Sequence, residues 1–328
     1  GCTSLTEVSL PKKLTIIPNS CFLGCPALSK VILPEGLTTI EGYAFQNCSS
    51  LQTIQLPSTI RVMTQAFAGC TGLVEIEIPE GVSILDNTFM DCPNLSKVTL
   101  PSSLTTIGTQ AFYRCSNLVS LHIPSGVTNI GSSAFRDCIA LSNIVLPSGL
   151  TTLGDYVFQD CRALSKIVLP NKLTSVPNSA FVNCQSLADV TLPVGLKSIG
   201  SSAFNGCGSL NTIQLPQGLT SIGEYAFCAC DGLTSLTIPS TVMSLGSSIL
   251  SNSDGITAIN LLPLMPPTIS SNTFSGAPAN MAINVLCGNK EFYVEDANWK
   301  SQQNRMYEIP AAVLSVKASD NRMGEVIV

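Results

Sequence analysis

Residues 141–161 read LSNIVLPSGLTTLGDYVFQDC, and the same pattern recurs along most of the chain. Its most constant feature is a Phe followed three residues later by a Cys, as in Phe158 and Cys161. The Phe positions are 22, 45, 67, 89, 112, 135, 158, 181, 204 and 227. They lie 23 residues apart, except for two intervals of 22 that end at Phe67 and Phe89. Self-similarity at a fixed period of this size indicates a repeat protein, and the register predicts about twelve units.

Each unit combines a short strand, a turn and a second apolar segment. Ile144 and Leu146 alternate with outward residues, which predicts a strand with Ile144 pointing inward. Pro147 ends that strand because a residue without an N–H cannot continue the ladder. The spacing of Phe158 and Cys161 predicts a single helical or 3₁₀ turn with both side chains on its inner face. One unit is therefore one coil of a solenoid.

A coil of 23 residues cannot bury its apolar stripe alone, but stacked coils can. Stacking places strand on strand at about 4.8 Å and produces ladders of identical residues beneath the sheet. The sequence therefore predicts an α/β solenoid of about twelve coils with one parallel β-sheet. The expected strands are centred on Ile54, Ile76, Val98, Leu121, Ile144, Ile167, Val190 and Ile213.

The chain divides into three parts. Residues 1–262 are the repeats, and because Gly1 already lies inside a motif, we expect a fragment that starts mid-repeat. Residues 263–309 break the register with Pro263 and are predicted to form an irregular last repeat and a cap, with a short helix in 290–299. That helix would hold Trp299 against the open end of the core. Residues 310–328 are predicted to start a small β module or to be a linker.

Low charge excludes several classes of function. Of 328 residues, 16 are Lys or Arg and 21 are Asp or Glu, giving a net charge of −5. Charged residues make up 11%, against about 25% in a typical domain. There is no basic patch for nucleic acid and no apolar run of about 18 residues that could insert into a membrane. With a single His, His122, the sequence predicts no catalytic, metal-binding or cofactor-binding residues, and no enzyme.

Eleven of the fourteen Cys residues occupy one repeat slot. Neighbouring coils would bring their Cα atoms to about 5 Å, so the distance permits disulfides. Side chains that point the same way do not aim at each other, however, and Cys behaves as a small apolar residue in such a ladder. We therefore expect a reduced packing ladder. Cys228 lies outside the slot, and we expect its side chain to point outward.

The unit LxxIxLPxGLTxIGxxAFxxC, nearly intact at 141–161, 187–207 and 210–230, resembles the BspA-like leucine-rich repeats of bacterial surface proteins and some parasitic protists. The resemblance covers residues 1–262 and continues to about 309. It implies a right-handed leucine-rich-repeat superhelix, of the kind Bacteroidetes carry, that is displayed at the cell surface or secreted. It also implies adhesion to host proteins or other microbes, and it carries over no catalytic residue.

The expected ligand surface is the outward side of the strands. Most outward residues are polar, but three consecutive coils place His122, Val145 and Val168 in one column, next to Asn143 and Lys166. An apolar centre with a polar rim is typical of binding hot spots, although β-branched residues also simply suit strands. The sequence therefore predicts a monomer that binds a protein or glycan ligand at the cell surface. The alternative is a rigid spacer that projects other domains.

Overall fold

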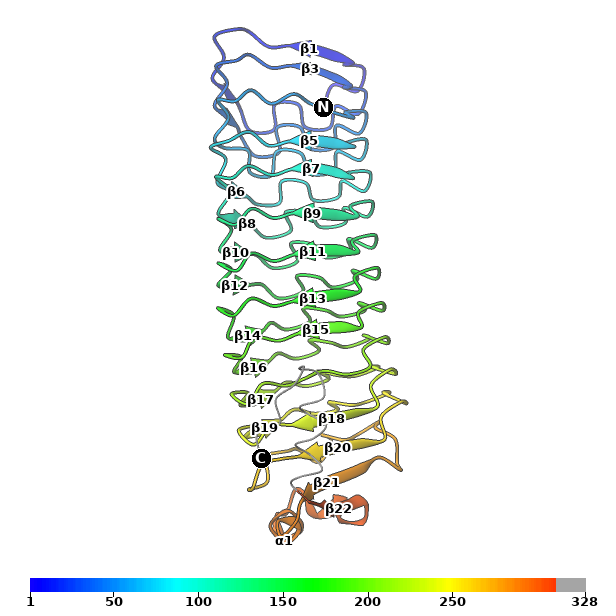
Figure 1. The fold of residues 1–328 in the computed structure, drawn as a ribbon. Helices are drawn as coiled ribbons and strands as arrows, with labels where there is room; N and C mark the ends of the chain where they lie inside the picture. Colours follow the sequence, from blue (N-terminus) through cyan, green and yellow to red (C-terminus); the bar gives the residue numbers. More distant parts are fainter. Residues whose placement is uncertain (311–328) are drawn as a thin grey trace.

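The chain winds into a curved stack of about thirteen coils of roughly 23 residues (Figure 1). This computed structural model describes residues 1–310, so the β module predicted for 310–328 lies outside the described residues apart from Pro310. All strand pairs in the described part are parallel, which confirms the predicted solenoid. Each coil has three sides, and they are described in turn below.

The first side, which we call the sheet face, carries the predicted strands (Figure 1). Neighbouring strands pair in register, with Ile144 opposite Leu121, for example. The segments around Ile54 and Ile213 bury these two residues but are not paired as strands, so the strands predicted there were wrong. Nothing in the structure explains these two segments, because the coil of Ile76, one residue short like that of Ile54, does form a strand. The strands of this face are β1 (Glu7–Ser9), β3 (Lys30–Ile32), β5 (Glu75–Glu77), β7 (Lys97–Thr99), β9 (Ser120–His122), β11 (Asn143–Val145), β13 (Lys166–Val168), β15 (Asp189–Thr191), β18 (Ser235–Ile238), β20 (Ala258–Leu261), β21 (Ala282–Leu286) and β22 (Met306–Ile309).

The second side carries another column of short strands, where the sequence predicted only one sheet. After the turn that follows Pro147, the chain returns in an extended conformation, and Leu153 points into the core while Thr152 faces out. We call this column the second sheet. Its strands are β2 (Ile16–Ile17), β4 (Thr39–Ile40), β6 (Ile84–Leu85), β8 (Thr106–Ile107), β10 (Asn129–Ile130), β12 (Thr152–Leu153), β14 (Ser175–Val176), β16 (Ser198–Ile199), β17 (Ser221–Ile222) and β19 (Ser244–Leu245).

The third side, which we call the turn face, consists of linked tight turns around the Phe and Cys positions. The predicted helical turn was wrong. Gln110 (φ 50°) and Arg114 (φ 58°) flank Phe112 in the left-handed region, which a right-handed helix excludes. With this backbone, the N–H of Phe112 donates to the carbonyl of Ala134 in the next coil at 2.8 Å. Hydrogen bonds therefore join the coils on this side as well.

Behind the turn face, Phe and Cys form two ladders. Successive Phe rings stack with centroids 5.3 to 6.0 Å apart, from Phe22 to Phe227. The thiol of Cys138 donates to the carbonyl of Phe112 at 3.1 Å, and the same bond recurs from Cys48 to Cys230. Ser253 stands in the next Cys place, and its hydroxyl donates to the Phe227 carbonyl at 2.7 Å. The Cys slot therefore satisfies a buried carbonyl, a polar role that its apolar surroundings did not predict.

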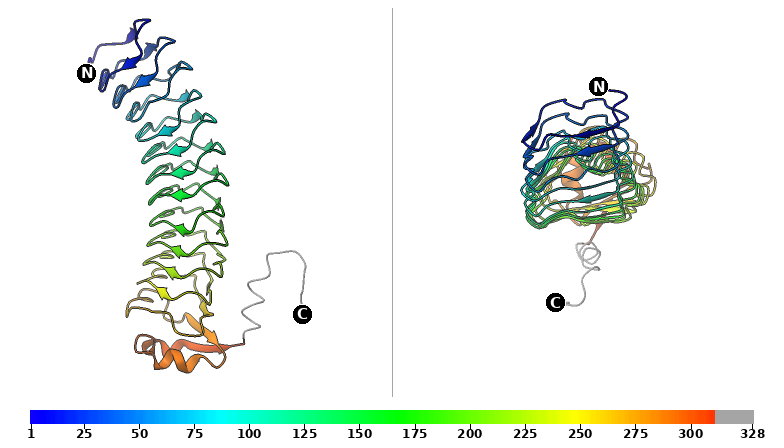
Figure 2. Two further views of the ribbon diagram at one scale, coloured as in Figure 1. Left: turned by 90° about the vertical axis from the view of Figure 1, so that its left-hand side faces the viewer. Right: turned by 90° about the horizontal axis from the view of Figure 1, so that it is seen from above.

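A cap follows the last regular coil (Figures 1 and 2). It contains strands β21 and β22, the helix α1 (Lys290–Glu295) and the 3₁₀ helix η1 (Lys300–Arg305). Tyr293 and Trp299 are fully buried, and each donates one hydrogen bond to a proline carbonyl, to Pro263 at 2.8 Å and to Pro267 at 2.7 Å. The two rings meet edge to face, 5.1 Å apart. The cap thus covers the apolar end of the stack.

Candidate binding surface

The five candidate contacts all lie on the sheet face. In β9, β11 and β13 the middle residue is buried and both flanking residues are exposed. His122 pairs directly with Val145, and Val168 follows on β13, the next strand of this face (Figure 1). Val145 is 72% exposed and Val168 is 50% exposed. We call His122, Val145 and Val168 the contact strip.

The column beside the contact strip contains Asn143 and Lys166, and its charges are paired within the chain. Lys166 Nζ lies 2.6 Å from Asp189 Oδ2 on the neighbouring strand β15. The same arrangement occurs between Glu7 and Lys30 at 2.6 Å and between Glu75 and Lys97 at 3.1 Å. Opposite charges on adjacent strands attract one another, so this column forms a nearly neutral rim.

One further residue belongs with this surface, and the sequence reasoning missed it. Val119 is 53% exposed and directly precedes β9, the strand that ends at His122. The two-residue alternation predicts an inward side chain at this position, two places before Leu121. The chain instead exposes both Val119 and Ser120 before it buries Leu121. The repeat unit does carry the signal for this exposure, because Val119 occupies the first x of LxxIxL, a position that is mostly polar in the other coils.

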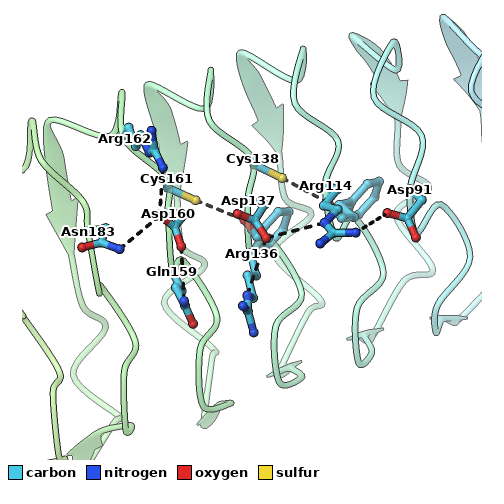
Figure 3. Close-up of polar contacts among 12 residues, drawn as sticks. Asp91, Arg114, Arg136, Asp137, Cys138, Gln159, Asp160, Cys161, Arg162 and Asn183 are labelled. Atoms are coloured by element: carbon cyan, nitrogen blue, oxygen red, sulfur yellow. Dashed lines mark hydrogen bonds and ion pairs between the residues drawn. The ribbon is translucent and has the colours of Figure 1, made fainter.

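The turn face carries a row of charged residues from several coils (Figure 3). Arg114 Nη1 lies 3.4 Å from Asp91 Oδ1, and Arg114 Nε lies 3.9 Å from Asp137 Oδ2. Arg136 Nε also approaches Asp137 Oδ2, at 3.6 Å. A cavity of about 370 Å³ lies beside Arg114, between Asp91, Asp137 and neighbouring Thr, Ser and Pro side chains. Because each of these carboxylates meets a guanidinium, the row links successive coils and is close to neutral.

The ladder thiols are poor nucleophiles. Burial raises the pKa of Cys48 to about 11 and that of Cys92 to about 12, and it raises the others from Cys70 to Cys230 in the same direction. Since the thiolate is the reactive form, such groups are inert at neutral pH. All fourteen Cys carry free thiols, as predicted for the ladder. The expectation for Cys228 was wrong: it is buried under the next coil, and the exposed thiols are those of Cys2, Cys21 and Cys287.

The described part of the chain has neither a metal-binding cluster nor a membrane-spanning helix. Within residues 1–310, no group of three or more His, Cys, Asp or Glu side chains is arranged to hold a metal ion. Among the helices of the same residues, none is long and apolar enough to cross a membrane.

The family model of the BspA type leucine rich repeat region (6 copies) matches this chain over residues 1–88, 58–165, 82–196 and 151–280. These segments cover most of its length. The chain belongs to the BspA-type leucine-rich repeat family. Solenoids of leucine-rich repeats are generally non-enzymatic scaffolds for binding, and this family is consistent with a role in binding or adhesion. No curated protein matches the sequence.

Several solved bacterial structures are similar to this leucine-rich repeat chain. A leucine rich cell surface protein from Faecalibacterium prausnitzii is 29% identical, with a TM-score of 0.56, over 84% of this chain and 83% of that one. The pneumococcal vaccine antigen PcpA superimposes with a TM-score of 0.63 over 94% of this chain and 88% of its own, at 18% identity. A leucine-rich repeat protein from Eubacterium ventriosum has 20% identity and a TM-score of 0.50, over 84% and 87%. The last two likenesses concern the fold alone.

Proposed function

We propose that this chain is a non-catalytic adhesion module of a bacterial cell surface that binds a protein ligand through the contact strip. The observation that carries the proposal is the exposure of Val145 and Val168, two aliphatic side chains on adjacent coils in a column that is otherwise mostly polar, with Ile32 far away as a single exception. Apolar surface with a polar rim is a common feature of protein-binding sites. His122 continues this column on the N-terminal side, and Val119 is exposed three residues before it in the chain.

The chemistry of the strip favours a protein over a glycan. Val145 and Val168 offer no hydrogen-bond donor or acceptor in their side chains, so they cannot replace the water around sugar hydroxyl groups. A protein ligand can bury the same side chains against its own apolar residues, which removes apolar area from water. Because Lys166 is paired with Asp189 within the chain, little unpaired charge is left to attract a ligand electrostatically. The proposed partner is therefore a protein with an exposed apolar patch, bound by one copy of this chain.

The test compares the double variant Val145→Lys, Val168→Lys with a matched control, Gln55→Lys, Thr99→Lys. The control residues occupy the same exposed column outside the contact strip. Beads coated with each protein are offered to immobilised extracellular-matrix proteins and to whole bacterial cells. We expect the strip variant to lose at least about tenfold in binding, because two charges would be buried unpaired, while the control binds like the parent. Thermal melts should show that both variants stay folded.

Other results would change the conclusion. Equal binding by the strip variant and the parent would place the site elsewhere. Binding that survives protease treatment of the target but is lost after periodate treatment would indicate a glycan. If the parent binds none of these targets, the second candidate gains support. That candidate is a rigid spacer, and it is favoured by the unbroken stack of Phe rings along the chain.

A further inference from the structure

Two adjacent coils, residues 141–163 and 164–186, are joined less completely than their neighbours. On the sheet face, β11 pairs only with β9 and β13 only with β15. On the second sheet, β12 pairs only with β10 and β14 only with β16. Among the described residues, both columns are therefore interrupted at the same boundary, which we call the seam.

The turn face continues across the seam without a break. Phe158 N–H donates to Ala180 O at 2.9 Å, and Asp160 N–H donates to Val182 O at 2.8 Å. The rings of Phe158 and Phe181 stack at 5.6 Å, as elsewhere in the ladder. The carboxylate of Asp160 also accepts a bond from the Asn183 side chain at 3.2 Å (Figure 3). One side of the boundary is thus fully bonded while the other two are not.

A proline gives a physical reason for the interruption in the second sheet. In the coils on either side, Gly154 donates to Ile130 O at 2.9 Å and Gly200 donates to Val176 O at 2.8 Å. Pro177 holds the equivalent position at the seam, and proline has no N–H to donate. Leu153, whose carbonyl would have accepted that bond, is 9% exposed, whereas Ile107 and Ile130 in the same column are fully buried. The core is therefore slightly open at this point.

A second boundary also lacks strand pairing on both sheets, but other hydrogen bonds join its two coils. Between residues 51–72 and 73–94, Val74 N–H donates to Gln52 O at 2.9 Å. The Arg61 guanidinium in the same interval donates to Glu80 O at 3.2 Å, which bridges the two coils on the side of the second sheet. At the seam, the described residues of the two sheets make no such bond, and the nearest ties lie just beyond the second sheet, where Asn178 donates its N–H and its side-chain amide to the Asp155 carboxylate at 2.9 and 3.4 Å. Within the two sheets, the seam thus has fewer bonds than the other boundary.

We infer that the seam is a hinge line on which the solenoid bends, with the turn face as its pivot and the two sheets as its opening side. Few cross-coil hydrogen bonds oppose such an opening, while the continuous turn face and Phe stack keep the two halves attached. Val145 lies on one side of the seam and Val168 on the other. Bending therefore changes the spacing between them. The inference itself does not depend on the proposed function.

Hydrogen exchange on the intact protein tests the hinge. We expect the amides of residues 146, 165, 166 and 174 to exchange faster than the equivalent amides one boundary later, 169, 188, 189 and 197, which donate to the neighbouring coil. The variant Pro177→Gly restores the donor and also removes the Cβ, because a Cβ at the equivalent Gly154 or Gly200 would lie only 2.3 or 2.7 Å from the backbone of the preceding coil. Seam amides in this variant should exchange up to about tenfold more slowly, the factor expected for one added backbone hydrogen bond.

A matched variant acts in the opposite direction. Gly200→Pro removes the 2.8 Å bond to Val176 and places a Cβ 2.7 Å from the backbone nitrogen of Asn178, so it should create a second rapidly exchanging boundary at residues 188, 189 and 197. Equal exchange at both boundaries of the parent protein would overturn the inference. So would a Pro177→Gly variant whose seam amides exchange at the parent rate. Because the parent measurement stands alone, the test remains decisive even if Gly200→Pro fails to fold.

Discussion

The turn face and the sheet face belong to the same coils, but only the turn face repeats its residue types from coil to coil. Along the turn face the same residue types recur, the Phe rings stack without a gap from Phe22 to Phe227, and each ladder thiol from Cys48 to Cys230 bonds a Phe carbonyl. Along the sheet face the outward residues change from coil to coil, and the strand pairing is interrupted. The comparison indicates that the turn side supplies most of the coupling between coils. The sheet side is thereby free to vary its chemistry.

The largest expected effect comes from titrating the thiol ladder. Burial raises the pKa of the Cys48 and Cys92 thiols to about 11 and about 12, above the roughly 8.5 of an unfolded chain. The unfolded state therefore loses its thiol protons first, so stability is fully present below about pH 8.5 and falls as the pH rises. Between the unfolded and folded pKa values, each such thiol contributes about 1.4 kcal/mol per pH unit, so nine of them acting together approach about 13 kcal/mol per pH unit, comparable to the stability of a typical domain.

Urea unfolding at pH 7.5, 9 and 10 measures this effect. We expect the unfolding midpoint to fall steeply above pH 9. The variant Cys138→Ser keeps a hydrogen-bond donor, as Ser253 does naturally, and should lower the slope by about one proton. A midpoint that stays constant from pH 7.5 to 10 would show that the ladder thiols titrate normally and are not buried as described.

A smaller effect is expected from a single break in the Phe ladder. Phe135 is fully buried between Phe112 and Phe158, with ring centroids 5.5 Å away on both sides. Phe135→Ala removes that contact area and leaves a cavity, so it should cost about 3 to 5 kcal/mol in the free energy of unfolding. The sheet-face control, Val145→Ala, should change stability by no more than about 0.5 kcal/mol. Similar losses in the two variants, measured by urea denaturation, would contradict the proposed division between the faces.

The smallest effect is expected at the ion pair of Lys166 and Asp189. Both side chains are more than half exposed, and exposed pairs contribute roughly 0.2 to 1 kcal/mol. A double-mutant cycle with Lys166→Met and Asp189→Asn should therefore give a coupling energy below about 1 kcal/mol, and high salt should reduce it. A coupling well above that value would mean that the sheet face also contributes substantially to holding coils together.

Much of the fold followed from the sequence because one pattern is repeated many times. The period of 23 identified the solenoid, and the buried positions of Ile144, Phe158 and Cys161 matched the apolar pattern. The orientation of Val145 and Val168 was also predictable, since side chains alternate along a strand. Their part in binding remains a prediction, as does the domain division at residues 262 and 309.

The features that could not be predicted from the sequence depend on contacts between coils. The left-handed backbone at Gln110 and Arg114 replaces a helical turn because the N–H groups bond the next coil, a preference that local spacing cannot reveal. The Lys166 to Asp189 pair and the Cys138 to Phe112 bond join residues more than 20 positions apart. The sequence by itself determined which residues face the core, because burial follows the local apolar period. Only the tertiary structure decided which polar groups meet across coils, because those distances depend on how each coil is seated on the next.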